Sequence, residues 1–167
     1  MRESAQTAVS WVRSHAPELG IETNFHRECD LHIHVPEGEV PKNGPSAGVT
    51  IALALVSALT GRPTRNGVAV SGEITLHGRV LPVGGLAEKA IAAHRSGMRT
   101  LPRPASNRRH LGDIPEDVRA ALGIVLLKTM DEVLKHGLAK APRGRGAARG
   151  KKPSDRGKKP SERYYAA

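Results

Sequence analysis

Residues 68–95 read VAVSGEITLHGRVLPVGGLAEKAIAAHR and set the fold class. Residues 68–74 and 79–83 are short runs rich in Val, Ile and Leu, and the turn at His77 between them predicts a hairpin. A Gly-Gly pair then breaks the chain, and apolar residues at helical spacing predict a helix over 86–95. Two strands followed directly by a helix indicate a domain that mixes both kinds of element.

The flanking sequence continues this alternation. The same periodicities predict further helices at 3–15, 46–59, 114–122 and 130–138, and further strands at 30–35, from 100, and at 124–127. We therefore expect an α/β domain of the mixed α+β kind over residues 1–139, with strands and helices interleaved.

Residues 140–167 differ from this body in composition. They hold 10 of the 26 Lys and Arg residues but 2 of the 16 Asp and Glu, so of the net charge of +10 the body carries +2. A Gly-, Pro-, Ser-, Lys- and Arg-rich segment without aliphatic periodicity predicts a disordered basic tail. Weak, salt-dependent nucleic-acid binding by the tail is one hypothesis, and a solubilising or linker-like terminus is the other.

Several classes of protein are disfavoured by composition. Cys29 is the single cysteine, so a disulfide framework or thiolate metal cluster is not expected, and we expect no metal. His32 and His34 alternate along a predicted strand, which favours polar-face histidines over zinc ligands. No secretory signal opens the chain and the longest apolar run is too short for a membrane span, so the expected compartment is the cytoplasm.

The loop at residues 41–48, PKNGPSAG, carries the strongest chemical signal. Ser46 lies between Gly-Pro and Ala-Gly at the expected start of a helix. Backbone N–H groups and the positive dipole end there can stabilise the oxyanion of an acyl transfer. The alternative is a helix N-cap, since serine is favoured at that position.

The same loop satisfies Gly-x-Ser-x-Gly from Gly44 to Gly48, the pattern of the nucleophile elbow in α/β-hydrolases. Asp113 followed by His136 would supply the remaining triad members in the expected order. The elbow requires a strand directly before the serine, whereas prolines here indicate a loop. A serine esterase of this kind is kept as the alternative function.

Lys89 is the candidate base for Ser46. It lies among small apolar residues on the helix predicted over 86–95. Burial of such a lysine lowers the pKa of its amine, so that the neutral form can accept a proton from a serine. The alternative is an ordinary solvated lysine whose head group lies in water.

Three segments together resemble the proteolytic domain of the Lon ATP-dependent proteases. They are DLHIHVPEGEVPKNGPSAG, VAVSGEITLHGRVLPVGGLAEKAIAAHRSGMRT and DIPEDVRAALGIVLLKTMDEVL, and the resemblance covers about residues 3–138. Ser46 and Lys89 are 43 residues apart, as in the family. The resemblance implies a serine endopeptidase with a Ser-Lys dyad. Ser46 is then the nucleophile, Lys89 the general base, and the backbone amides of Ser46 and Ala47 the oxyanion hole.

Two positions depart from the family pattern. Ser71 stands where the family usually has threonine, and the resemblance implies that its hydroxyl orients the Lys89 amine. Asn43 stands where the family often has an acidic residue that can pair with the lysine and hold the site inactive. We therefore expect charge-based self-inhibition to be weaker here, so Asn43→Asp should lower peptidase activity.

The resemblance also sets expectations beyond this chain. The sequence has no Gly-x-x-x-x-Gly-Lys-Ser/Thr motif, so ATP and Mg are expected only on a separate ATPase module, and no cofactor in this chain. The family's domain usually begins a few strands earlier, so N-terminal strands are expected to be missing. Family members degrade unfolded or damaged proteins in quality control and assemble as homo-oligomers, usually hexamers. A catalytically weak scaffold is the remaining alternative.

Overall fold

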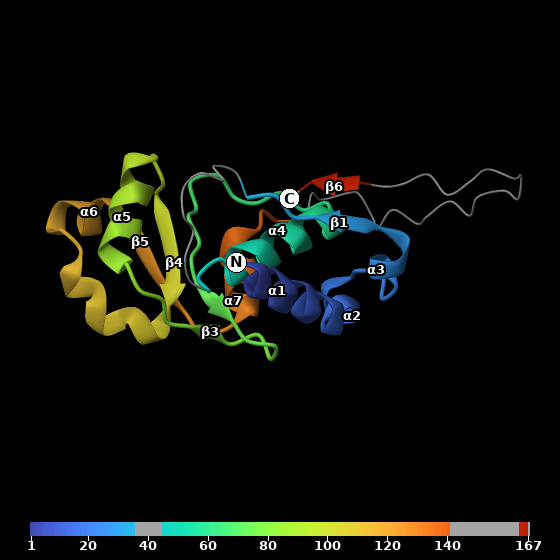
Figure 1. Ribbon diagram of the computed structural model, residues 1–167. Coiled ribbons are helices and arrows are strands. Elements are labelled where there is room, and N and C mark those ends of the chain that lie inside the picture. Colours follow the sequence, from blue (N-terminus) through green and yellow to red (C-terminus); the bar gives the residue numbers. More distant parts are fainter. Residues whose placement is uncertain (36–44, 141–163, 167) are drawn as a thin grey trace, which may run out of the picture.

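The computed structural model describes residues 1–35, 45–140 and 164–166 (Figure 1). The mixed α+β class predicted from the sequence is confirmed. The helices are α1 (Arg2–Ser14), α2 (Ala16–Leu19), α3 (Phe25–Glu28), α4 (Gly48–Thr60), α5 (Leu86–Arg95), α6 (Glu116–Ala121), α7 (Met130–Gly137) and a 3-10 helix, η1 (Ala105–Asp113). The strands are β1 (Asp30–His32), β2 (Glu73–Ile74), β3 (Val80–Leu81), β4 (Thr100–Pro104), β5 (Gly123–Leu127) and β6 (Tyr164–Ala166).

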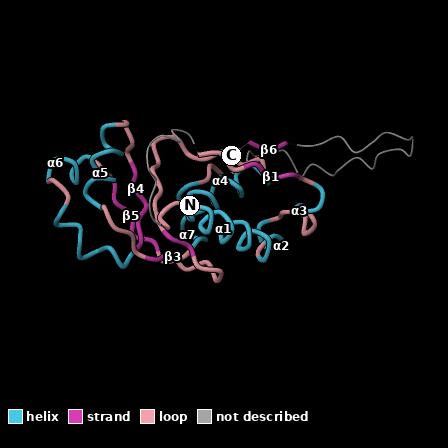
Figure 2. Tube along the Cα trace, in the orientation of Figure 1, coloured by secondary structure: helices cyan, strands magenta, loops and turns pink. Residues whose placement is uncertain are grey.

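The strands are short and pair two by two (Figure 2). β2 and β3 form the expected antiparallel hairpin, with Glu73 opposite Leu81. β4 and β5 run parallel, with Leu101 opposite Ile124. β1 pairs in parallel with β6, so the last residues of the chain lie beside an N-terminal strand. A parallel pair needs a crossover between its strands, which for β4 and β5 is provided by η1 and α6.

The larger hydrophobic core surrounds α4. This helix is apolar nearly all round, and it packs against α1 on one side and α7 on another. Because a helix without a polar face gains stability only when it is enclosed, its sequence dictates this central position. We call this cluster the α4 core; its fully buried members include Trp11, Val12, Val49, Ala52, Val56, Met130 and Val133.

A second, smaller core lies between α5, α6 and the β4–β5 pair. Its buried members are Leu86, Ala90, Ala93, Leu101, Ile114, Val118 and Leu122, and we call it the β4–β5 core. Figure 1 shows the two parts side by side, with α5, α6 and β4 at one end of the molecule and α1, α2 and α4 towards the other. α5 spans the residues predicted from its periodicity.

The segment 68–72 is not the strand predicted there, since only β2 at its end has strand structure. Its backbone bonds instead to two different neighbours. Val68 forms an isolated parallel bridge with Thr100 at the start of β4. Gly72 exchanges hydrogen bonds with the residues that open α4. The segment thus joins the α4 core to the β4–β5 core.

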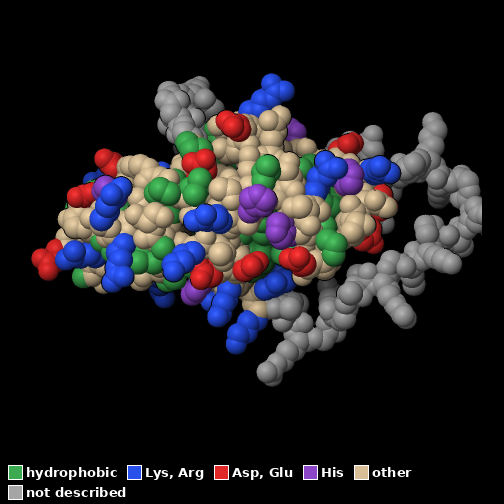
Figure 3. All heavy atoms as spheres, turned by 90° about the horizontal axis from the view of Figure 1, so that it is seen from below, with side chains coloured by type: hydrophobic (Ala, Val, Ile, Leu, Met, Phe, Trp, Pro, Cys, Tyr) green, Lys and Arg blue, Asp and Glu red, His purple; other side chains and the backbone are tan. Residues whose placement is uncertain are grey.

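Most of the basic tail lies outside the described residues. Of its described part, Lys140 is exposed, and Tyr164–Ala166 form β6 rather than continuing a wholly irregular tail. On the body, Lys and Arg side chains are interspersed with Asp and Glu on the face seen in Figure 3 and do not gather into one patch. This agrees with the near-neutral charge of the body.

Candidate active site

Ser46 lies in a turn directly before α4. The side chain is partly buried, and the residue at the N-cap of α4 is Ala47, with no side-chain cap hydrogen bond. Ser46 is therefore not the N-cap that the simpler interpretation of the sequence predicted. Ser46 thus precedes a buried helix without acting as its cap.

The backbone around Ser46 is fixed by the segment 70–72. The Gly72 amide donates to the Ser46 carbonyl at 3.1 Å, and the Val49 amide donates to the Gly72 carbonyl at 3.2 Å. The Thr50 hydroxyl donates to the Val70 carbonyl at 2.8 Å. These three bonds hold the first turn of α4, and with it the serine, in one position.

Gly48 allows this helix start to approach β2 closely. A Cβ atom at Gly48 would lie 2.8 Å from Ile74 Cγ2, well inside van der Waals contact. Beside the turn lies a pocket of about 380 Å³, between the start of α1, the serine turn and β2. It is lined in part by Glu3, Ser4, Pro45 and Glu73. The pocket is large enough for one side chain of a bound peptide.

Lys89 lies on the second part of the site, in the first half of α5. Its side chain is partly buried, and Nζ donates to the Gly84 carbonyl at 2.9 Å. Burial lowers the pKa of this amine, and the positive charge of Arg103 lowers it further, whereas Glu88 opposes the shift. The environment therefore favours the neutral form more than bulk water does. Among the described residues, no hydrogen bond joins Lys89 to Ser46 or Ser71.

Two residues that support Lys89 were missed by the sequence analysis. Asn107 of η1 is buried and holds the loop before α5 by two hydrogen bonds: its Oδ1 accepts from the Val83 amide at 3.0 Å, and its Nδ2 donates to the Val83 carbonyl at 2.9 Å. Arg103 of β4 is buried below the first turn of α5. An arginine inside an otherwise apolar parallel strand is the signal that could have identified it.

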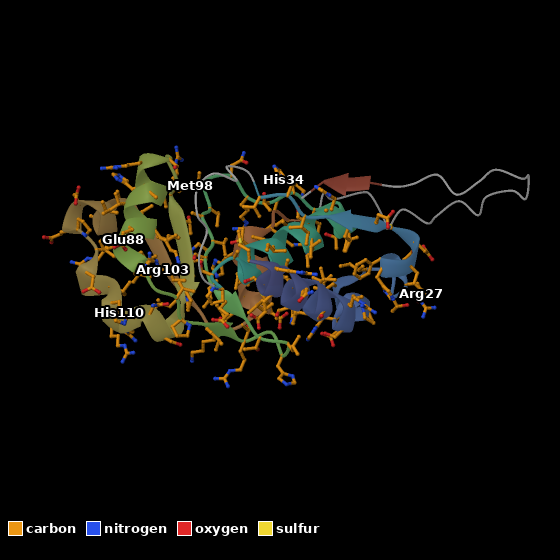
Figure 4. The ribbon with its side chains drawn as sticks, in the orientation of Figure 1. Arg27, His34, Glu88, Met98, Arg103 and His110 are labelled. Atoms are coloured by element: carbon orange, nitrogen blue, oxygen red, sulfur yellow. The ribbon has the colours of Figure 1, made fainter. Side chains whose placement is uncertain are left out.

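The structure does not assemble the alternative hydrolase triad. Asp113, at the end of η1, pairs with His110 at 3.3 Å. His136 lies on α7, and no contact between Asp113 and His136 is found in the described part of the chain. Figure 4 shows His110, the partner of Asp113, at the end of the molecule that carries α5.

The structure describes three of the four other positions that the sequence singled out, namely Ser71, His32 and His34. Asn43 lies outside the described residues. Ser71 is partly buried, one residue before the amide that bonds to Ser46. His32 and His34 are both exposed, with ring centroids 6.4 Å apart, as expected for polar-face residues. No group of three or more metal-ligating side chains is found among residues 1–35 and 45–140.

Comparison with known proteins identifies the class to which this fold belongs. Residues 1–140 match the family described as the Lon protease (S16) C-terminal proteolytic domain, so the chain belongs to the Lon family through this domain. It is 60% identical over 138 residues to Lon protease 1 of Bacillus subtilis, covering 83% of this chain. It is 56% identical over 144 residues to the Lon protease of Brevibacillus choshinensis and 53% identical over 144 to that of Vibrio parahaemolyticus, each covering 86% of this chain.

The match covers a small part of each relative. The chain spans 18% of the length of these three curated relatives. The similarity is thus to their proteolytic domain. Separately, no helix within the described ranges has the length and apolar character needed to cross a bilayer.

Proposed function

We propose that this domain is a serine peptidase in which Ser46 is the nucleophile and Lys89 the general base. The observation that carries the proposal is the environment of Lys89, where burial and a neighbouring cation lower the pKa of the amine. A lysine acts as a base only in its neutral form, so such an environment suits the role. Ser46 lies directly before α4 and is not its N-cap, and the chain belongs to the Lon family; both observations support the same assignment.

The reaction follows from these roles. Neutral Lys89 accepts the proton of the Ser46 hydroxyl while Oγ attacks the peptide carbonyl carbon. The backbone amides of Ser46 and Ala47 stabilise the oxyanion of the tetrahedral intermediate. The Lys89 ammonium then returns the proton to the leaving amine, and water hydrolyses the ester left on Ser46.

The reaction requires Lys89 to exchange its hydrogen-bond partner. In the structure Nζ donates to the Gly84 carbonyl, so the side chain must turn away from that carbonyl towards Ser46. Rotamer changes of this kind are fast compared with peptide hydrolysis. We assign Ser71, which lies next to the amide bonded to Ser46, the role of orienting the amine after it turns.

The function of a whole protein built on this domain is part of the same proposal. The relatives' name, Lon protease, supports a chain that cleaves proteins, and we propose unfolded or damaged proteins as its substrates. We further propose that ATP hydrolysis occurs on a separate module and that the domain acts within a homo-oligomeric ring. Sedimentation of the domain, alone and joined to an ATPase module, tests the assembly.

A serine-reactive fluorophosphonate probe, read by intact mass, tests the dyad directly. We expect one adduct on the native chain, none on Ser46→Ala, and a greatly reduced rate on Lys89→Met. The matched control is Ser96→Ala, which changes an exposed serine at the C-terminal end of α5 and should label normally. Normal labelling of Lys89→Met together with loss in His136→Ala would favour the hydrolase triad and refute the proposal.

A further inference from the structure

Arg103 is a buried cation that the proposed mechanism does not use. Its side chain is 3% exposed within β4. Nη2 donates to the Leu86 carbonyl at 3.0 Å, whereas Nε and Nη1 are buried and have no hydrogen-bond partner among the described residues. The neighbouring positions of the strand are apolar, and no acidic side chain pairs with the guanidinium within residues 1–35 and 45–140.

Such an arrangement is costly for the fold. A buried charge without a counter-charge loses its hydration and gains little in exchange. Burial lowers the pKa of Arg103 to about 10, which still leaves the guanidinium charged at neutral pH. A hydrophobic side chain of similar volume would fill the same space at less cost in folding free energy. Stability therefore does not explain the presence of a charge at position 103.

The charge lies beside the helix start that carries the proposed base. Arg103 bonds to the Leu86 carbonyl in the first turn of α5, and Lys89 follows one turn later on the same side of the helix. Lys89 bonds to the Gly84 carbonyl, two residues before Leu86. Two cations are thus held by carbonyls of one short stretch of backbone. Figure 4 shows Arg103 and Glu88 together at this end of the molecule.

We propose that Arg103 is a positioning residue of the serine–lysine site, whose buried positive charge disfavours the ammonium form of Lys89 and whose hydrogen bond to Leu86 fixes the turn that carries it. This inference rests on the proposed function only for the use of Lys89 as a base. The effect of one cation on the other is a property of the fold and can be measured without any substrate.

Other charged groups near α5 do not replace Arg103 in this role. On α5 itself Glu88 acts in the opposite direction. On η1 the His110–Asp113 pair is exposed, on the rim of a pocket shared with Glu88 and Gly84. The remaining charged groups on α5, η1 and α6 are exposed, where water and salt screen them: His94, Arg95, Arg108, Arg109, Glu116, Asp117 and Arg119.

The test is an NMR titration of Lys89 in the full chain. Lysine labelled with ¹³C at Cε reports the protonation of each amine, and the Lys89 signal is assigned by its absence in Lys89→Met. We expect Arg103→Met and Arg103→Gln to move the Lys89 titration to higher pH, because both remove the charge. In Arg103→Lys the Lys89 titration should lie between those of the native chain and Arg103→Met, because a lysine buried at position 103 loses its charge at lower pH than an arginine does.

Arg103→Gln and two further variants separate the effect of charge from that of packing. Arg103→Gln retains a hydrogen-bond donor for the Leu86 carbonyl, so it removes the charge with less effect on the turn. Glu88→Gln should move the titration to lower pH, and by less, because Glu88 is exposed. Arg99→Met, an exposed arginine just before β4, is the matched control and should leave it unmoved.

Thermal unfolding of the same variants supplies a second readout. We expect Arg103→Met to unfold at a temperature equal to or above that of the native chain, because a lone buried charge has been removed. Where the chain is an active peptidase, the acidic limb of its kcat/KM profile should also move to higher pH, with activity on that limb falling several-fold.

The proposal is overturned if Arg103→Met leaves the Lys89 titration in place, or if the control Arg99→Met moves it as far as Arg103→Met does. It is also overturned if neither neutral variant folds, since Arg103 is then needed for the fold alone. A shifted titration in a chain whose Ser46 takes no probe refutes the proposed function and leaves the inference standing. Normal labelling of Ser46 by the probe, together with a Lys89 titration that Arg103→Met does not move, supports the proposed function and refutes the inference about Arg103.

Discussion

The serine and the lysine of the candidate site rest on supports of different kinds. Ser46 opens α4, which is enclosed by the larger core and tied at its first turn by three hydrogen bonds to residues 70–72. Lys89 lies on α5, which covers one side of the smaller core and begins after an exposed Gly-Gly pair. Ser46 is held by enclosure of its helix, whereas Lys89 depends on its own hydrogen bond to Gly84 and on the polar contacts that Asn107 and Arg103 make with the nearby backbone.

The difference indicates which half of the site can adjust. A fully enclosed helix moves only when its core is disrupted, because protein interiors are close-packed. A helix on a small core, anchored by a loop and single hydrogen bonds, opens at lower cost. The proposed rotation of Lys89 towards Ser46 would therefore take place on the side of the candidate site that the fold holds less firmly.

The largest effect on the free energy of unfolding is expected when one buried leucine in each of the two cores is truncated to alanine. Leu55→Ala in the α4 core and Leu122→Ala in the β4–β5 core remove leucines that are each 3% exposed. Each change should lower the free energy of unfolding by about 2–5 kcal/mol, with Leu55→Ala the costlier because its surroundings collapse less readily. Urea unfolding measures both, and a greater cost for Leu122→Ala would contradict the comparison.

A smaller effect is expected at the helix start beside Ser46. Gly48→Ala places a methyl group 2.8 Å from Ile74 Cγ2, so α4 or β2 must shift. We expect a loss of about 1–3 kcal/mol in unfolding free energy and slower probe labelling of Ser46. Gly112→Ala, whose Cβ would meet nothing within 4 Å, is the control. Unchanged labelling in Gly48→Ala would show that the serine is not held by this contact.

Near Lys89, the change that weakens the support of the helix start is Asn107→Ala, because Asn107 holds the loop before α5. It removes both hydrogen bonds to Val83 while leaving the α4 core untouched. Since Val83 is partly exposed and water can replace the amide, the cost should be about 1 kcal/mol. Amide hydrogen exchange should quicken in α5 and not in α4. Equal quickening in both helices would indicate that the two supports open together.

The smallest effect is a pH dependence of stability. Because the pKa of Lys89 is lowered in the folded chain, the unfolded chain binds more protons between that lowered pKa and the ordinary lysine pKa of 10.5. The stability contributed by this group therefore rises with pH across that window. Lys89→Met should remove the rise, which a pH series of urea unfolding curves would reveal. Lys128→Met, at an exposed lysine, should retain it.

Elements with strong periodicity were predicted well from the sequence. The helix at 86–95 was predicted to the residue, and the apolar helix before Gly61 to within two residues, because burial imposes its spacing directly on the side chains. The 3-10 helix η1 was not predicted. Its residues are polar and aperiodic, and it is held by the tertiary hydrogen bonds of Asn107.

The site was predictable only in part. The serine turn was visible as a Gly- and Pro-rich loop before an apolar helix, but the pairing of Ser46 with Lys89 came from family resemblance and not from spacing. Segment 68–72 was predicted as a strand because its apolar residues fit one, while its backbone partners lie far away in the sequence. Arg103 was not predicted because a charged side chain is usually exposed, and its place in a largely apolar strand was the only local signal of burial.

Segment 68–72 also sets the spacing between the serine turn and the start of β4. Its near end accepts and donates at the serine turn, through Gly72, and its far end is fixed at Thr100, which receives the Ala69 amide at 3.0 Å. Extended chain advances about 3.3 Å per residue. A single-residue insertion or deletion between these anchors would change the offset between the two halves by about that length, so length variation should be tolerated in the loops on either side and not here.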